Sequence, residues 1–124
     1  AEALAAAGFR IERPPEDWLF KAWHQGVLVD VLHRLVGVPV EHRLVADAEQ
    51  QDVLGVRMPV LTPTVVMTTK MLSLSEQYCD LGTLLPGARA VRERIDWVEV
   101  AAATADHPFA EAFLFLARRL GITD

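Results

Sequence analysis

The sequence has little of several features that mark familiar protein classes. It contains one cysteine in 124 residues, which leaves no internal disulfide framework and fits the reducing cytoplasm. It has no apolar run near the roughly 20 residues of a membrane helix, so no membrane partner is expected. Acidic residues outnumber basic ones, 17 to 12, and a net charge of −5 argues against nonspecific DNA binding.

Motifs of the common catalytic sites are also missing. The chain has no G-x-x-x-x-G-K-S/T phosphate loop, no G-x-G-x-x-G dinucleotide motif and no G-x-S-x-G nucleophile motif. The lone Cys79 is interpreted as a packing residue. Metal-ligand spacing is absent from the four histidines, which are His24, His33, His42 and His107. Serine-nucleophile, phosphate-loop and zinc chemistry are therefore not supported.

The first half of the chain carries mostly strand patterns. Two apolar runs, 18–24 and 27–35, are separated only by Gln25 and Gly26, which predicts a tight β-hairpin. The acidic, polar stretch 45–52 is expected to form a short helix. The run that follows it, VLGVRMPVL, is again typical of a strand.

The second half is expected to be helical. Thr62 is a helix N-cap with Pro63 at the first helical position. Further helices are expected to begin at Asp80 or only at Pro86, after Asp96, and near Pro108. Strands followed by helices predict an α+β fold, divided into a sheet-containing part, 1–61, and a helical part, 62–124, of one compact unit.

Asp30 is the first candidate for chemistry. It interrupts VLVDVL, 27–32, where every other residue is apolar, and such a run predicts a strand covered on both faces. Burying a lone carboxylate costs on the order of several kcal/mol unless hydrogen bonds, an arginine or a metal ion offset the cost. Mg²⁺ is held by one or two carboxylates with substrate phosphates. Asp30 is therefore either a metal ligand or a structural carboxylate.

Lys70 is the second candidate. Its surroundings, VVMTTKMLSLS, contain no other charge, and Gln77 is expected on the same helix face. A lysine in such a place could reach a phosphate as a point charge. The alternative is a solvated lysine on an amphipathic helix.

The order of these patterns resembles the nucleotidyltransferase superfamily of DNA-polymerase-β-like fold, specifically its small bacterial nucleotidyltransferase-like proteins. The resemblance covers nearly the whole chain and is carried by short segments whose order makes them specific. These segments are LAAAGFR, KAWHQGVLVDVLHRL, MPVLTPTVVMTTKML, SEQYCDLGTLLPGARAVRERIDW and HPFAEAFLFLARRLGI.

The resemblance implies a partial mixed sheet in 1–61 followed by a helical bundle. It implies transfer of a nucleoside monophosphate from a nucleoside triphosphate to an acceptor hydroxyl of a small molecule, protein or RNA, with Mg²⁺ as cofactor. Asp30 would be the third metal-supporting carboxylate and a metal ligand or base. Lys70 would contact the triphosphate, and Asp80 or Glu76 would orient the acceptor or the lysine.

One family feature is missing from the chain. The family has a Gly-Gly or Gly-Ser turn followed by D-x-D or D-x-E before the third acid, whereas the only similar letters here, DAE at 47–49, come after Asp30. We expect the missing segment to precede Ala1 and the 124 residues alone to be inactive. The alternative is a degenerate relative, related to toxin–antitoxin proteins, that acts as a non-catalytic interaction module or pairs with a second copy through a sheet edge.

Overall fold

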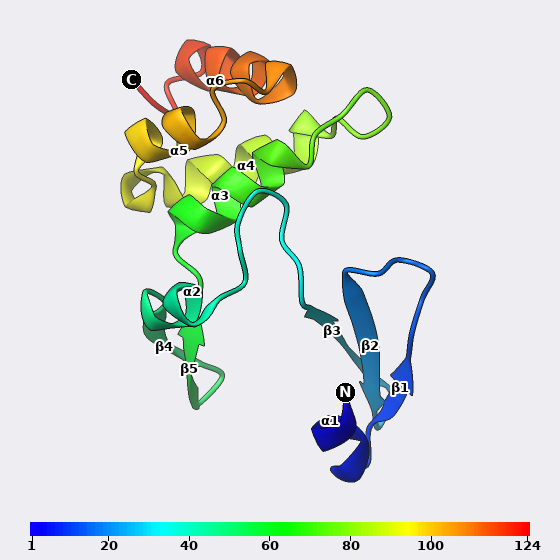
Figure 1. Cartoon of the computed structure of the whole chain (residues 1–124). Helices are drawn as coiled ribbons and strands as arrows, with labels where there is room; N and C mark the ends of the chain where they lie inside the picture. The colour runs from blue at the N-terminus through cyan, green and yellow to red at the C-terminus, as the bar shows by residue number, and fades with distance from the viewer. The chain divides into compact units, whose positions relative to one another are not determined.

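The computed structural model describes the backbone of all 124 residues and every side chain except that of Arg43. The chain divides into two compact units, Ala1–Leu35 and Val36–Asp124, which are described separately below. Antiparallel sheets occupy the N-terminal half and helices the C-terminal half, which confirms the α+β class (Figure 1). Within the described residues, no helix has both the length and the apolar character needed to cross a membrane.

The first unit is a short helix followed by a three-stranded sheet in the order β1-β2-β3. Gln25 and Gly26 both have positive φ, 49° and 81°, as a two-residue turn of type I′ requires. The predicted hairpin is therefore confirmed. All strand pairs of the described chain are antiparallel, so the expectation of a mixed sheet is not met. The elements are α1 (Glu2–Ala6), β1 (Arg10–Glu12), β2 (Leu19–His24) and β3 (Val27–Leu32).

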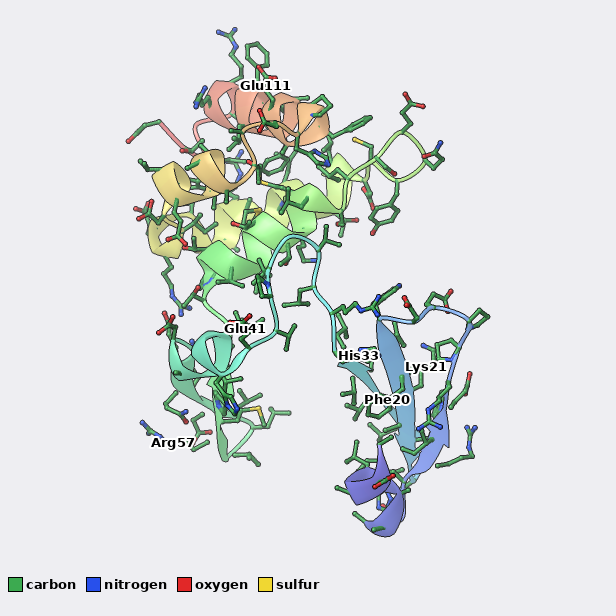
Figure 2. All side chains as sticks on the ribbon, viewed as in Figure 1. Phe20, Lys21, His33, Glu41, Arg57 and Glu111 are labelled. Carbon is green, nitrogen blue, oxygen red and sulfur yellow. The ribbon has the colours of Figure 1, made fainter. Side chains whose placement is uncertain are left out.

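The two faces of this sheet differ in character. The register places Lys21 directly opposite both Asp30 on β3 and Glu12 on β1, so these three side chains share one face. The other face carries mostly apolar side chains, with His24 at its end, and Ala22 at its centre is the one residue of the unit that is buried. Figure 2 labels Lys21 together with its neighbour Phe20, which belongs to the apolar face.

The second unit begins with a short helix and a hairpin, α2 (His42–Ala46), β4 (Glu49–Val53) and β5 (Val56–Val60). The expectation of a short helix over 45–52 is wrong for its second part, because Glu49 begins a strand. Polar residues such as those of β4 do not favour strands by themselves. The strand forms because it pairs with β5, which supplies its hydrogen bonds. Leu54 and Gly55 form the turn with φ of 51° and 82°.

Four helices complete the unit: α3 (Pro63–Leu72), α4 (Leu81–Val91), α5 (Trp97–Ala103) and α6 (Pro108–Arg119), with a 3₁₀ turn, η1 (Arg92–Arg94), after α4. The predicted caps are confirmed, since Thr62 accepts a bond from the backbone N–H of Val65, and Asp96 accepts one from that of Glu99. Helix α4 begins at Leu81 and continues through Pro86 without a break.

The core of the second unit lies among its helices. Met71, Val100 and Phe113 are its largest fully buried side chains and come from α3, α5 and α6. A partly buried hydrogen bond joins two of the helix starts, because the Thr64 hydroxyl accepts from the backbone N–H of Asp96 at 2.9 Å. This core fixes α3 and α4 side by side, and the groove between them holds the pocket described below.

Candidate functional site

Asp30 lies on an exposed strand. Five of the six residues of β3 are exposed, so the expectation of a strand covered on both faces is wrong for this chain. The carboxylate of Asp30 accepts a hydrogen bond from Lys21 Nζ at 3.1 Å across the hairpin. The Asp30 side chain is 45% exposed, and such a pair contributes at most about 1 kcal/mol to stability. The cost of burial that made a metal ion attractive therefore does not arise here.

A second polar group lies on the same face of the sheet. The Glu12 carboxylate accepts a hydrogen bond from the indole N–H of Trp23 at 3.1 Å and faces Arg10 at 3.6 Å. The Arg10 guanidinium lies 5.4 Å from the centre of the Trp23 ring, in cation–π contact. These contacts engage Glu12 with Trp23 and Arg10, and no contact among the described side chains joins it to Asp30.

The described residues do not fit a magnesium site by themselves. Magnesium requires oxygen ligands in near-octahedral geometry. The protein usually supplies one or two carboxylates, and the substrate supplies phosphate oxygens. Among the described side chains, no group of three or more His, Cys, Asp or Glu residues is placed to hold a metal ion. Asp30 offers one carboxylate, and Lys21 already occupies one of its oxygens. We therefore derive no catalytic step through a metal ion.

A pocket of about 260 Å³ lies between α3 and α4, wholly within the second unit. Two of the residues predicted from the sequence for nucleotide binding, Lys70 and Asp80, line it together. The third, Glu76, is exposed in the turn between the helices and does not line the pocket. Most of the remaining wall is apolar: Pro63, Val66, Met67, Leu74, Leu84, Gly87 and Val91.

Lys70 is the cationic side chain of this pocket. It lies in the last turn of α3, where a positive charge interacts favourably with the negative end of the helix dipole. Its side chain is exposed and makes no hydrogen bond or ion pair with the side chains that the structure describes. The Ser73 hydroxyl donates to the Lys70 carbonyl at 2.7 Å and closes the helix end. The ammonium is therefore available to an anion.

Asp80 is the N-cap of α4. Its carboxylate accepts from the Thr83 hydroxyl at 2.6 Å and from the Thr83 backbone N–H at 3.0 Å. These bonds, the hydroxyl bond first, hold the pKa of Asp80 below its ordinary value, because they favour the ionised carboxylate. The backbone N–H of Gly82 also favours the ionised form. The two carboxylate oxygens have four lone-pair positions, so these bonds leave room for a donor in the pocket.

Tyr78 is a residue of this pocket that sequence reasoning missed. It lines the pocket from the segment between α3 and α4, and it is 63% exposed. The turn is held by Ser75 N–H donating to the Tyr78 carbonyl at 2.8 Å and by Tyr78 N–H donating back to Ser75. No pattern in the sequence marks Tyr78, because its place at the pocket depends on the turn that these bonds form.

The histidines and Cys79 have roles in packing or capping, or lie exposed. His24 packs its ring 4.8 Å from that of Phe9, and His107 is the N-cap of α6 through its Nδ1. Cys79 is an exposed free thiol, so its interpretation as a packing residue is wrong. It follows Tyr78 in the turn between α3 and α4, where the chain runs over the surface.

Comparison with protein-family models, with curated proteins and with solved structures finds no match to this chain. The resemblance to nucleotidyltransferases therefore stays a prediction from the sequence, and the geometry above is what bears on function.

Proposed function

We propose that the chain is the nucleotide-holding part of a nucleotidyltransferase-like protein that moves a nucleoside monophosphate from a nucleoside triphosphate to an acceptor hydroxyl. The observation that carries the proposal is the α3–α4 pocket, because Lys70 and Asp80, which are both predicted from the sequence to bind nucleotide, line one cavity. An apolar pocket with a few convergent polar groups is the usual form of a small-molecule site.

The residues of this chain would divide the work of binding. Lys70 supplies the positive charge for the phosphates, since it is the one cation among the described residues of the pocket wall. Asp80 is negatively charged and repels phosphate, so it would face the sugar or the base. In the transfer itself, the acceptor oxygen bonds to the α-phosphorus, pyrophosphate leaves, and the hydroxyl proton passes to a base.

Asp30 keeps the role that the family resemblance implies, as one metal-supporting carboxylate and a candidate base. Its exposure leaves the side chain accessible, and a metal ion would displace Lys21 from the oxygen that the ammonium occupies. The described residues do not complete a magnesium site, so the 124 residues by themselves are proposed to bind nucleotide without turning it over.

Titration of the protein with nucleoside triphosphate and with tripolyphosphate, with and without Mg²⁺, tests the role of Lys70. Lys70→Ala is expected to weaken binding of both anions about tenfold or more, because a charge-assisted contact is lost. Arg57→Ala is the matched control, because Arg57 is an exposed cation of β5 that does not line the pocket (Figure 2). Equal binding by the wild type and Lys70→Ala would contradict the proposal.

The role of Asp30 is tested separately, by titration with Mg²⁺ in the absence of nucleotide, because Asp30 lies in the first unit and the pocket lies in the second. Asp30→Ala is expected to weaken the binding of Mg²⁺. Glu16→Ala, which removes an exposed carboxylate outside the sheet, is expected to leave Mg²⁺ binding unchanged. An Asp30→Ala variant that binds Mg²⁺ as tightly as the wild type would reject the role given to Asp30.

A second candidate function is favoured by a different observation. β3 is an edge strand of the β1-β2-β3 sheet, and its exposed side chains include Val27, Leu28 and Val29. An exposed apolar edge of this kind is a template for pairing with another strand. The corresponding proposal is a non-catalytic module that pairs through β3 with a second copy of the chain.

Sedimentation velocity over a range of protein concentrations tests this candidate. The wild type is expected to form dimers as concentration rises, and Val29→Lys is expected to remain monomeric because a charged edge blocks pairing. Monomers at every concentration for both proteins would reject pairing between copies. The two candidates are therefore separated by measurements that do not depend on each other.

A further inference from the structure

Tyr78, which lines the α3–α4 pocket, has an aromatic ring that is largely open to solvent. Tyr78 is 63% exposed, although its backbone is held by a short turn in which it donates to and accepts from Ser75. An aromatic side chain on a fixed backbone offers a flat surface at low entropic cost. Base–aromatic stacking uses such a surface, because every nucleobase has a π-face.

The apolar walls of the pocket suit a flat, partly apolar group. Val66 and Met67 of α3 and Leu84 of α4 supply apolar surface, and only a few polar groups interrupt it. The cavity volume of about 260 Å³ lies just below the roughly 300–1,000 Å³ of drug-sized sites, which fits one ring system better than a whole triphosphate. The phosphates would then extend toward Lys70 and solvent.

Asp80 adds chemical selectivity to this wall. Its carboxylate is ionised and, after its two bonds to Thr83, still has lone pairs for a donor. An exocyclic amino group supplies such a donor, whereas a carbonyl at the same place would face a negative charge without a hydrogen bond. Asp80 is exposed, so water satisfies its free lone pairs when no ligand donor is present. The preference therefore comes from the charge-assisted bond with an amino group and from the repulsion of a carbonyl oxygen.

We propose that the Tyr78 end of the α3–α4 pocket is a nucleobase subsite that prefers a base with an exocyclic amino group, with Tyr78 stacking on the ring and Asp80 accepting from the amino group. The assignment rests on the proposed function for the identity of the ligand as a nucleotide. It goes beyond that function by naming which end of the pocket takes the base and which bases it favours.

The chain offers a clean probe for this subsite. Because Tyr78 is the only tyrosine, protein labelled with ¹³C-tyrosine gives one set of ring signals in an NMR spectrum. Cytidine and uridine are a matched pair of ligands, since they differ at the position where cytidine has an amino group and uridine a carbonyl. Cytidine is expected to shift the Tyr78 ring signals to saturation, with uridine about tenfold weaker and ribose 5-phosphate without effect.

Variants separate stacking from recognition of the amino group. Tyr78→Ala is expected to weaken cytidine triphosphate about tenfold while leaving tripolyphosphate unchanged, and Tyr78→Phe is expected to bind like the wild type. Asp80→Asn keeps a good N-cap residue, so α4 is retained, and it is expected to abolish the preference for cytidine over uridine. Circular dichroism at 222 nm confirms that each variant keeps its helices.

The outcomes distinguish this inference from the proposed function. If nucleoside triphosphate binds in a Lys70-dependent way but no nucleoside shifts the Tyr78 signals, the base subsite is overturned and the proposed function stands. If cytidine shifts Tyr78 while tripolyphosphate and nucleoside triphosphate show no Lys70-dependent binding, the subsite stands and nucleotidyl transfer is rejected. Equal shifts with cytidine and uridine would overturn the selectivity assigned to Asp80.

Discussion

The Asp80 carboxylate has two roles, one in stability and one in the pocket. As the N-cap of α4 it accepts two hydrogen bonds from Thr83, and as a pocket residue it keeps lone pairs for a ligand. Its role as an N-cap can be measured from the pH dependence of the free energy of unfolding. Since folding lowers the pKa of Asp80, the native state favours the ionised form more than the unfolded chain does.

The sign of this effect follows from linkage. The stabilisation by Asp80 is fully present above the ordinary pKa of its carboxyl group and is lost as the pH falls through the lower, folded-state pKa. We expect Asp80→Ala to lower the free energy of unfolding at pH 7 and to differ less from the wild type as the pH falls into the acid range. Urea unfolding at a series of pH values measures the difference.

Asp80→Asn is the control for that experiment, because asparagine is as good an N-cap as aspartate but does not titrate in this range. Its stability relative to Asp80→Ala should stay nearly constant with pH. A difference between the wild type and Asp80→Ala that is the same at pH 3 and pH 7 would show that the charge of Asp80 contributes nothing to the cap.

At the scale of elements, the β4–β5 hairpin contains a residue in a conformation that its side chain disfavours. Leu54 has φ of 51° in the turn and is fully exposed, so no packing offsets the strain. A left-handed conformation costs an ordinary L-residue roughly 1–2 kcal/mol, whereas asparagine before glycine is the favoured pair for a type I′ turn. We expect Leu54→Asn to stabilise the hairpin by about 1 kcal/mol.

Hydrogen exchange of the β4 and β5 amides measures this prediction, since the gain should appear as slower exchange in these strands. Leu54→Ala is the matched control, because it removes the exposed apolar side chain while leaving a Cβ at positive φ. If Leu54→Ala and Leu54→Asn slow exchange equally, the effect comes from removal of the leucine side chain and not from the turn geometry.

The same elements show what the sequence could predict. Gln25–Gly26 and the caps at Thr62 and Asp96 are local signals, because each depends on a few neighbouring residues, and each is confirmed. The pairing of Lys21 with Asp30 was also within reach, since a two-residue turn sets the register of the hairpin. The exposure of β3 could not be predicted, because an apolar pattern shows which residues can be buried and does not show whether another element covers them.

The strand Glu49–Val53 was misread for a related reason. Its residues are polar and favour no strand by themselves, and the strand forms because Val56–Val60 folds back on it. In the candidate site, Lys70 could be named from its uncharged surroundings, and Asp80 from the family resemblance. Tyr78 could not, because the turn that brings it to the rim of the pocket depends on hydrogen bonds to Ser75.

At the scale of the whole chain, the two units differ sharply in how much they bury. The Ala1–Leu35 unit has Ala22 as its one buried residue, whereas the helices of Val36–Asp124 enclose a continuous cluster around Met71, Val100 and Phe113. Isolated strands need a hydrophobic face packed on something to be stable in water. The stability of the chain is therefore expected to be concentrated in the helical core.

Native-state hydrogen exchange measures this difference directly. Amides of β2 and β3 are expected to exchange with opening free energies near the low end of the native range, while those of α3 and α6 approach the global free energy of unfolding, roughly 5–15 kcal/mol. Burying β3 would slow its exchange, so a cognate strand or a second copy should raise protection of Val27–Leu32 and leave α6 unchanged. If β3 in the chain alone is protected as strongly as α6, the prediction is wrong. Such protection would require another element to cover β3, whereas five of its six residues are exposed.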